Sequence, residues 1–450
     1  MSKQPSRGFL IFSLIWLGQL VSLIGSGLTS FALGVWVYQT KGSVMAYALI
    51  LLATTAPNVL LSPLAGALVD RWDRRQAMLL SDIGAGISTL VIYLLFNAGQ
   101  VRLWHILLAA ASSSAFSAFQ WPAYAASTTL LVPKKHLGRA NGMIQLSQAI
   151  GYIASPALAG MLMATTGIRG VILIDFITFL FAVLTLGGVR IPRPEPEDER
   201  EVSPRALLEE ITFGWRYLAE RPGLMGILTL FGIANFLLGL VMALYTPMVL
   251  SFANTQVMGI VTSVGASGML FGGALMSVWG GPERRINAVL GCMFIEGLAL
   301  SIGGLSPSVP LVAGAAFVFF FCFPIDSASN NAIWQSKVDP NVQGRVFAMR
   351  NVVAMASMPV AYLLAGPLAD RVFEPLLAPD GILAGSVGRL IGVGEGRGIG
   401  LMFILMGALT MVSALGGFLH PRIRLVEEDL PDFPGEEGTS SSAVAEPAPV

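Results

Sequence analysis

Four acidic residues lie inside long apolar stretches of this 450-residue chain: Asp82, Asp175, Glu296 and Asp326. An ionisable side chain at membrane depth costs at least about 2.5 to 3.5 kcal/mol on insertion scales, so each acid is a functional candidate. Loss of water disfavours the charged form of a carboxyl group, which can then bind and release a proton as its surroundings change. Acids of this kind are therefore candidates for proton-linked chemistry, with protons as a partner.

The composition places these acids in a membrane protein. Hydrophobic residues make up 54% of the chain and charged residues only 12%, whereas soluble domains carry about 25% charged residues. A helix needs about 20 apolar residues to cross the hydrocarbon core. Twelve runs of that order lie near residues 9–38, 44–69, 77–96, 103–131, 141–165, 170–189, 223–251, 257–280, 286–304, 309–336, 346–370 and 399–421. We expect an all-α membrane protein with twelve transmembrane helices and no cleavable signal peptide.

Basic residues predict the orientation of these helices, because cytoplasmic loops retain Lys and Arg. With the N-terminus inside, six of the 27 basic residues fall on the outer side: Lys41, Arg102, Arg169, Arg371, Arg389 and Arg397. The bias predicts a multi-pass protein with N- and C-termini in the cytoplasm.

A weak internal repeat divides the chain. One constant shift aligns Gly160 with Gly366 and Gln120 with Asp326, and transporter folds often contain such repeats. The pattern predicts two six-helix, pseudo-symmetric bundles of the same orientation. Their predicted bounds are 1–189 and 223–421.

Two further segments are polar. The connection 190–222 is predicted to be a cytoplasmic linker, in which Ser203 and Pro204 begin an amphipathic helix on the inner membrane surface. The segment 422–450 is rich in acids and prolines. It is predicted to be a disordered cytoplasmic tail.

A charged motif ends the second predicted span. Gly66, Asp70 and Arg71, followed by Arg74 and Arg75, resemble the loop 2-3 signature of the major facilitator superfamily. The resemblance implies an inner gate in which Asp70 caps a helix of the other half. The alternative is that Arg74 and Arg75 only fix topology and touch anionic lipid. The gating candidates are Gly66, Asp70, Arg71, Arg74, Arg75 and Asp82.

The fifth predicted span carries a second motif. Gly151, Ser155, Pro156 and Gly160 are similar to the antiporter signature of the same superfamily, with Ser and Ala replacing two glycines. The segment 366–371 resembles the branch that holds macrolide-efflux proteins and the enterobactin exporter, a drug:proton antiporter branch. That branch implies a bacterial plasma (inner) membrane.

The resemblance also implies which acids face a central cavity, since helices 1, 4, 7 and 10 of that family line it. Asp326 is thus the first proton-coupling candidate and Glu296 the second, the alternative for Asp326 being a structural, hydrogen-bonded acid. Asp175 is expected to be structural. The substrate-cavity candidates are Gln19, Gln120, Trp121, Tyr124, Asn235 and Asn330. Span 103–131 lacks the arginine through which drug antiporters of this superfamily often couple protons.

The expected function is secondary active, proton-coupled efflux of amphipathic small molecules, such as drugs, macrolides or siderophore-like compounds, by alternating access. Alternatives are an uptake or facilitative transporter of the same fold, and a non-transporting receptor or lipid scramblase. Cys292, Cys322 and three histidines are scattered, so we expect no metal, no cofactor and no enzyme activity. Zero net charge gives no sign of a nucleic-acid partner. The expected partners are the substrate, protons and membrane lipids, and the protein is expected to be monomeric.

Overall fold

The structure is a computed structural model that describes residues 7–133, 136–189, 204–339 and 342–431, and the regular elements in these ranges are helices. The first half contains α1 (Arg7–Lys41), α2 (Val44–Arg71), α3 (Arg74–Asn97), α4 (Leu103–Leu131), α5 (Leu137–Thr165) and α6 (Gly167–Gly187). The second half contains α7 (Pro204–Ala219), α8 (Pro222–Leu250), α9 (Thr255–Trp279), α10 (Arg285–Leu305), α11 (Val309–Lys337), α12 (Gln343–Leu368) and α15 (Arg397–Leu419). Short elements complete it: the π-helix η2 (Ala369–Phe373), α13 (Glu374–Leu376), α14 (Gly388–Ile391), α16 (Pro421–Arg424) and α17 (Val426–Asp429).

Eleven helices of the described residues are long and apolar enough to cross a membrane. The remaining long helix, α4, has 29 residues but does not meet the same criterion, because serines at 112–114 and 117 lower its hydropathy. The predicted all-α membrane fold is therefore confirmed. Eleven of the twelve predicted spans are supported by length and composition, and the span on α4 stays a prediction.

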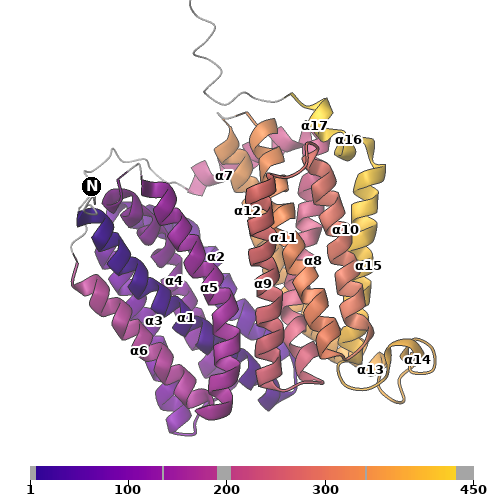
Figure 1. The fold of residues 1–450 in the computed structure, drawn as a ribbon, viewed down its shortest axis with the longest axis horizontal. Coiled ribbons are helices and arrows are strands. Elements are labelled where there is room, and N and C mark those ends of the chain that lie inside the picture. Colours follow the sequence, from indigo (N-terminus) through magenta and orange to yellow (C-terminus); the bar gives the residue numbers. More distant parts are fainter. Residues whose placement is uncertain (1–6, 134–135, 190–203, 340–341, 432–450) are drawn as a thin grey trace, which may run out of the picture.

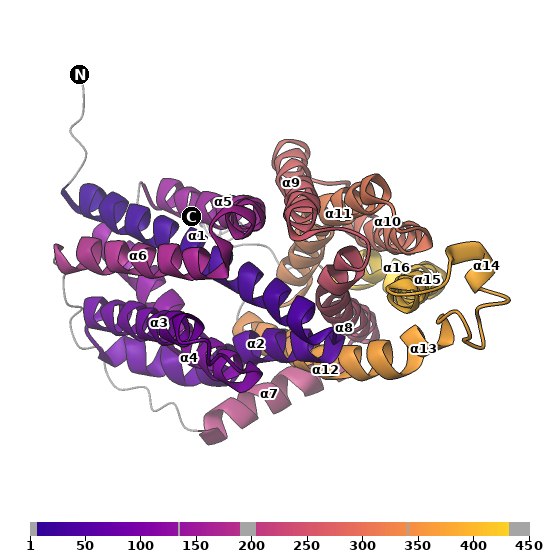
Figure 2. The same ribbon diagram turned by 90° about the horizontal axis from the view of Figure 1, so that it is seen from below.

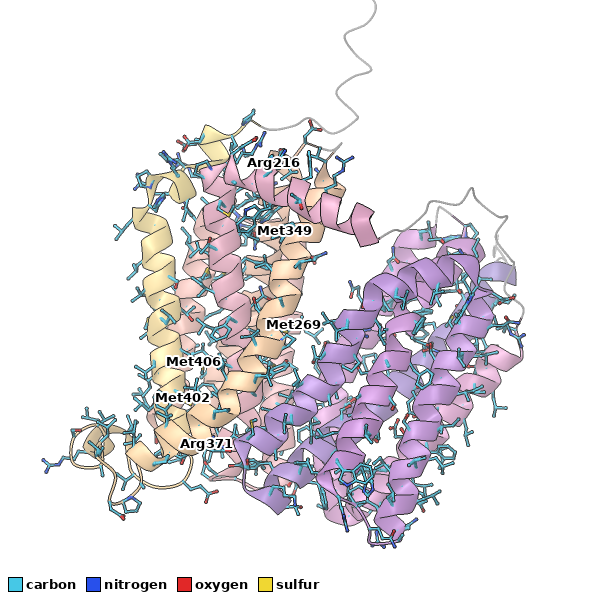
Figure 3. The ribbon with its side chains drawn as sticks, turned by 180° about the vertical axis from the view of Figure 1, so that it is seen from behind. Arg216, Met269, Met349, Arg371, Met402 and Met406 are labelled. Atoms are coloured by element: carbon cyan, nitrogen blue, oxygen red, sulfur yellow. The ribbon has the colours of Figure 1, made fainter. Side chains whose placement is uncertain are left out.

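The long helices form two groups, which lie side by side in Figures 1 and 2. In the N-terminal bundle, α1 to α6, the helix α4 packs on α2 and α3, and α6 packs on α1 and α3. In the C-terminal bundle, α8 to α12 with α15, the helix α10 packs on α11 and α15, and α11 packs on α9. The bundles meet mainly along α5 with α9 and along α2 with α12. Figure 3 labels Arg216 and Arg371 at opposite ends of the C-terminal bundle.

Local sequence explains where several helices begin and end. Ser43 and Asn254 cap α2 and α9 by accepting hydrogen bonds from backbone N–H groups of the first turn, and Asp73 does the same for α3. Such caps satisfy N–H groups that have no partner within the helix. The end of α9 is followed by Gly280 with a φ of 74°, a conformation that glycine adopts without steric cost.

Helix α7 begins at Pro204, the residue predicted to open the helix of the linker. It packs against α12, where Gly214 lies so close to the Arg345 carbonyl that a Cβ would be 2.8 Å from it. Leu218 is buried, whereas Trp215 on the same helix is exposed. The linker residues 190–203 lie outside the described residues.

The disorder predicted from residue 422 onward is wrong for residues 422–431. Here α16 and α17 pack against the C-terminal bundle through the buried side chains of Ile423 and Val426. Lys337 Nζ donates to the carbonyl oxygens of Glu427 and Leu430, both at 2.6 Å. Two apolar residues and a basic partner thus hold a segment whose composition alone favours disorder. Residues 432–450 lie outside the described part of the chain.

Candidate functional site

Three polar side chains from three helices meet inside the N-terminal bundle. Gln19 Nε2 of α1 donates to Asp82 Oδ2 of α3 at 3.0 Å, and Gln120 Nε2 of α4 donates to Asp82 Oδ1 at 3.0 Å. Gln120 Nε2 also donates to Gln19 Oε1 at 2.8 Å. Asp82 is buried. Amide donors thus replace water at both carboxylate oxygens, which is the condition for burying a charged group.

This triad forms part of the wall of a polar cavity of about 340 Å³. The lining comes from α1, α2, α3, α4 and α6 and carries many hydroxyl groups, among them those of Ser22, Thr54, Ser88 and Ser113. Two of the predicted substrate-cavity residues, Gln19 and Gln120, therefore line a cavity within one bundle. The sequence had predicted them to face a cavity between the halves.

Asp175 of α6 lies on the wall of the same cavity. It is 1% exposed, and its Oδ1 has no hydrogen-bond partner among the described residues. Its Oδ2 accepts from Thr89 Oγ1 at 3.4 Å, which is a long and weak contact. The hydroxyl groups of Thr29, Thr89 and Thr178 lie beside this carboxyl group, and the structural role expected for Asp175 stays a prediction.

The two coupling candidates lie together in the C-terminal bundle. Asp326 of α11 and Glu296 of α10 are close enough for their charges to interact, and one oxygen of each is buried without a hydrogen-bond partner among the described residues. Arg350 of α12 interacts with Asp326 electrostatically. Its guanidinium also donates to Asn331 Oδ1 at 2.6 Å and lies 4.7 Å from the ring centre of Phe231. The structure thus joins two acids and one base at one point of this bundle.

The other predicted cavity residues are dispersed. Asn330 is buried and accepts from Trp334 Nε1 at 2.9 Å, and Asn235 donates to the Phe231 carbonyl of its own helix. Tyr124 is buried in the core of the N-terminal bundle, with no partner for its hydroxyl among the described residues. Trp121 is exposed. These four residues are not brought into one described pocket.

The predicted gating residues are only partly described. Gly66, Asp70 and Arg71 fall within α2, and their side chains lie outside the described residues. Arg75 donates to the carbonyl oxygens of Leu186 and Gly187 at 3.1 and 2.6 Å, which ties α3 to the end of α6. Arg74 donates weakly, at 3.5 Å, to the Trp72 carbonyl. In this conformation both carboxylate oxygens of Asp82 accept from glutamines, and no described arginine is hydrogen bonded to it.

The motif on α5 packs helices closely on two sides. Ser155 Oγ donates to the Ile24 carbonyl of α1 at 3.2 Å, and a Cβ at Gly151 would lie 3.2 Å from Leu23. Toward α9, a Cβ at Gly160 would lie 2.9 Å from the Thr255 carbonyl, and the Pro156 carbonyl lies against Gly259. Small residues thus allow the two bundles to approach backbone to backbone.

The bundles are joined at the end of the molecule where α1 ends and α2 begins, which we call the sealed end. Asp370 of η2 accepts from Ser43 Oγ at 2.8 Å and from the backbone N–H groups of Val44 and Met45 at 3.0 and 3.1 Å. It thereby caps α2 from the other bundle, at the positive end of the helix dipole. Sequence reasoning missed this role, although it had singled out the segment 366–371.

Further contacts across the bundles accompany this cap. Tyr47 shares a hydrogen bond of 3.0 Å with Thr246, and Gln39 donates to Thr255 Oγ1 at 3.0 Å. Ser263 Oγ donates to the Ile153 carbonyl at 2.7 Å. Together with the Asp370 cap, these side-chain hydrogen bonds join the two bundles directly.

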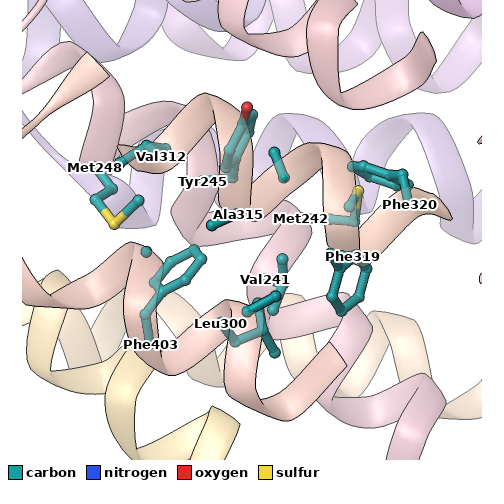
Figure 4. Close-up of a pocket in the computed structure, with 13 residues that line it drawn as sticks. Val241, Met242, Tyr245, Met248, Leu300, Val312, Ala315, Phe319, Phe320 and Phe403 are labelled. Carbon is teal, nitrogen blue, oxygen red and sulfur yellow. The ribbon is translucent and has the colours of Figure 1, made fainter. Parts of the chain in front are cut away.

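A second cavity, in the C-terminal bundle, is small and apolar (Figure 4). It has a volume of about 30 Å³, and its lining includes Phe319, Phe320, Phe403 and Met242. Tyr245, which carries a hydroxyl group, also lies on its wall. A cavity of this size and lining is too small for an organic substrate. The described residues also contain no group of three or more His, Cys, Asp or Glu that could hold a metal ion.

Comparison with known proteins agrees with this architecture. The sequence profile described as Major Facilitator Superfamily matches residues 15–362. Macrolide efflux protein A of Streptococcus pyogenes is 31% identical over 372 residues, which cover 80% of this chain and 90% of that protein. Multidrug efflux pump Tap of Mycolicibacterium fortuitum is 25% identical over 370 residues, covering 79% and 88%.

Solved structures resemble the fold at lower identity. The crystal structure of a bacterial homolog to the human lysosomal transporter Spinster, in an inward-facing and unoccupied conformation, has a TM-score of 0.72 at 15% identity. The alignment covers 95% of this chain and 99% of that chain. The resemblance to the macrolide-efflux branch is confirmed, and the relatives are transporters rather than enzymes. With its multi-pass helical fold and a profile match from residue 15 to residue 362, the chain belongs to the Major Facilitator Superfamily of membrane transporters.

Proposed function

We propose that this transporter exports amphipathic small molecules from a bacterial cell by proton-coupled alternating access. The observation that carries the proposal is the identity of 31% to a macrolide efflux protein along 90% of that protein's length. The buried acids in both bundles support proton coupling, because a secondary active exporter driven by protons needs groups that bind and release a proton during the cycle. Drugs, macrolides and siderophore-like compounds are the substrate class.

The proposed movement is a rocking of one bundle against the other around the substrate site between them, which opens one end of the molecule as it closes the other. Residues 1–189 and 223–421 act as the moving bodies, 190–222 as their linker, and 422–450 as a cytoplasmic tail. With both termini in the cytoplasm, as the basic residues predict, the sealed end faces outward. The cap of Asp370 on α2 then belongs to the inward-facing state.

The proposed gate at the opposite end uses Gly66, Asp70, Arg71, Arg74 and Arg75. When the inner ends of the bundles approach each other, Asp70 caps a helix of the C-terminal bundle and holds that end closed. This role would mirror that of Asp370 at the sealed end.

Coupling is proposed to rest on Asp326, with Glu296 beside it. When Asp326 carries a proton, its attraction to Arg350 is weakened, which changes how α11 is held against α12. Substrate is proposed to contact Trp121, Tyr124, Asn235 and Asn330 during the cycle. The protein is proposed to work as a monomer surrounded by membrane lipid.

Accumulation of a labelled macrolide in intact cells tests the direction and the substrate class. A susceptible bacterium that expresses the chain is expected to accumulate less macrolide than cells with an empty vector, and collapse of the proton gradient is expected to abolish the difference. Cells that accumulate more macrolide than the vector control would identify an uptake transporter and contradict export. Equal accumulation of macrolides, hydrophobic cations and siderophores in both strains would contradict the proposed substrate class.

A further inference from the structure

We propose that the polar cavity inside the N-terminal bundle is a hydrated proton-binding site, with Asp175 as the group that takes up the proton. It lies apart from the acids of the C-terminal bundle, so the transporter would hold exchangeable protons in both bundles. Proton binding itself stands on the geometry of this cavity. Only the use of that proton in transport rests on the proposed function.

The cavity is large and polar enough to hold water. Its volume of about 340 Å³ corresponds to roughly ten water molecules at about 30 Å³ each. Hydroxyl groups from four helices line it, including Thr29, Ser88, Ser113 and Ser117. Water in a cavity needs two to four polar partners, and this lining supplies them at many positions.

The charges of the cavity are uncompensated. Among the described residues, its lining includes two carboxyl groups, those of Asp82 and Asp175, and no Lys, Arg or His. Among the described side chains, the other charged or titratable residues on α6 and on the helices packed against it are Tyr38 and Lys41 of α1, Arg74, Arg75, Asp82 and Tyr93 of α3, His136, Arg139 and Tyr152 at or on α5, and Arg169 of α6. Apart from Asp82, none of these lines the cavity. Two negative charges in a buried cavity whose described lining holds no base are costly, and binding of a proton removes one of them.

The two acids have different surroundings, which assigns the proton to Asp175. Asp82 accepts from two amide N–H groups at 3.0 Å, and such donors stabilise a carboxylate. Asp175 Oδ1 has no donor among the described residues. The hydroxyl groups of Thr29, Thr89 and Thr178 lie beside Asp175, but among the described residues only that of Thr89 is within hydrogen-bond distance of a carboxylate oxygen, at a long 3.4 Å. A protonated carboxyl group gains an O–H donor that water or a hydroxyl oxygen accepts.

Helix α1 closes the cavity over Asp175. A Cβ added to Gly25 would lie 2.9 Å from Asp175 Oδ1 and would also collide with Thr178. The carboxyl group is therefore covered on the α1 side, and exchange with water runs through the cavity.

Infrared spectroscopy of the full-length protein in detergent tests the site without substrate. The carbonyl stretch of protonated carboxyl groups is compared in H₂O and D₂O for wild type, Asp175→Asn and the control Asp326→Asn. We expect Asp175→Asn to lose a D₂O-sensitive part of this band that Asp326→Asn retains, and Asp175→Glu to restore it. An unchanged band in folded Asp175→Asn, or a lost part that does not shift in D₂O, would overturn the proposal.

A second measurement needs no variant. Carbodiimides react with protonated carboxyl groups, so peptide mass spectrometry of labelled wild-type protein is expected to find Asp175 modified, with less label as the pH rises. Absence of label on Asp175 at low pH would overturn the proposal even if Asp175→Asn fails to fold. If pH-driven flux is absent while the infrared band and the label persist, the proposed function fails and this site stands.

Discussion

Replacement of Asp370 by alanine is expected to weaken the sealed end. The side chain accepts three hydrogen bonds from Ser43, Val44 and Met45 of the other bundle. Each contributes about 1 kcal/mol net, so Asp370→Ala should destabilise the closed state of this end by about 3 kcal/mol. That is a shift of roughly 150-fold in the equilibrium between closed and open. Asp370→Asn keeps one acceptor oxygen and should lose about 1 to 2 kcal/mol.

Pulsed electron paramagnetic resonance measures this shift directly. Spin labels at Gln100→Cys and Ser306→Cys report on the two bundles, because both residues are exposed and follow helices that end on the side of the sealed end. Cys292 and Cys322, both buried and free, are replaced by alanine so that they are not labelled. Asp370→Ala is expected to move the distance distribution toward longer separations in the absence of substrate.

A matched control separates this effect from a general loss of acidic charge. Asp380 is an exposed acid in the loop that follows η2, and it makes no described hydrogen bond across the bundles. Asp380→Ala should leave the distances unchanged. Equal distributions for wild type and Asp370→Ala would refute the reasoning that this cap holds the end closed.

Three further predictions concern packing and buried polar groups. Gly259→Val places a branched side chain against the backbone of α5 and should destabilise the fold by about 1 to 3 kcal/mol. Thermal unfolding in detergent measures this effect. The control is Gly273→Ala, which is expected to be neutral because a Cβ at Gly273 meets open space. Gln120→Leu removes a donor from Asp82 and should cost about 1 to 3 kcal/mol in the same assay, and an unchanged melting temperature would contradict the role of the triad. Lys337→Met removes two hydrogen bonds to the C-terminal segment and is expected to speed proteolysis of that segment. A proteolysis rate identical to that of wild type would contradict this prediction.

The sequence predicted the helices well because lipid imposes a strong and simple constraint. The second span, predicted over 44–69, is the helix Val44–Arg71, and the other long helices lie within a few residues of their predicted bounds. Ile423 and Val426 show where composition misleads. They are two apolar residues next to a segment rich in acids and prolines, yet both are buried in a hydrophobic core cluster of the C-terminal bundle.

Side-chain partners were harder to predict than helices. Gln19 and Gln120 were predicted to line one cavity and are hydrogen bonded to each other, whereas their shared partner Asp82 was predicted only as a gating residue near the arginines. An apolar transmembrane helix has no polar face that tells which way Asp82 points, so its partners appear only when three helices are packed. Asp370 was overlooked because a cap on a helix of the other bundle links segments more than 300 residues apart, as the separation of 327 between Ser43 and Asp370 illustrates.

Simultaneous flux of substrate and protons in proteoliposomes tests the central claim most directly. Liposomes that contain the purified protein are loaded with a macrolide, a pH gradient is imposed, and both lumenal pH and macrolide are followed for wild type and Asp326→Asn. Proton-coupled export predicts that wild type moves macrolide and protons in opposite directions and that Asp326→Asn uncouples or abolishes both. Wild-type macrolide flux that is indifferent to the pH gradient would contradict proton coupling and identify a facilitator.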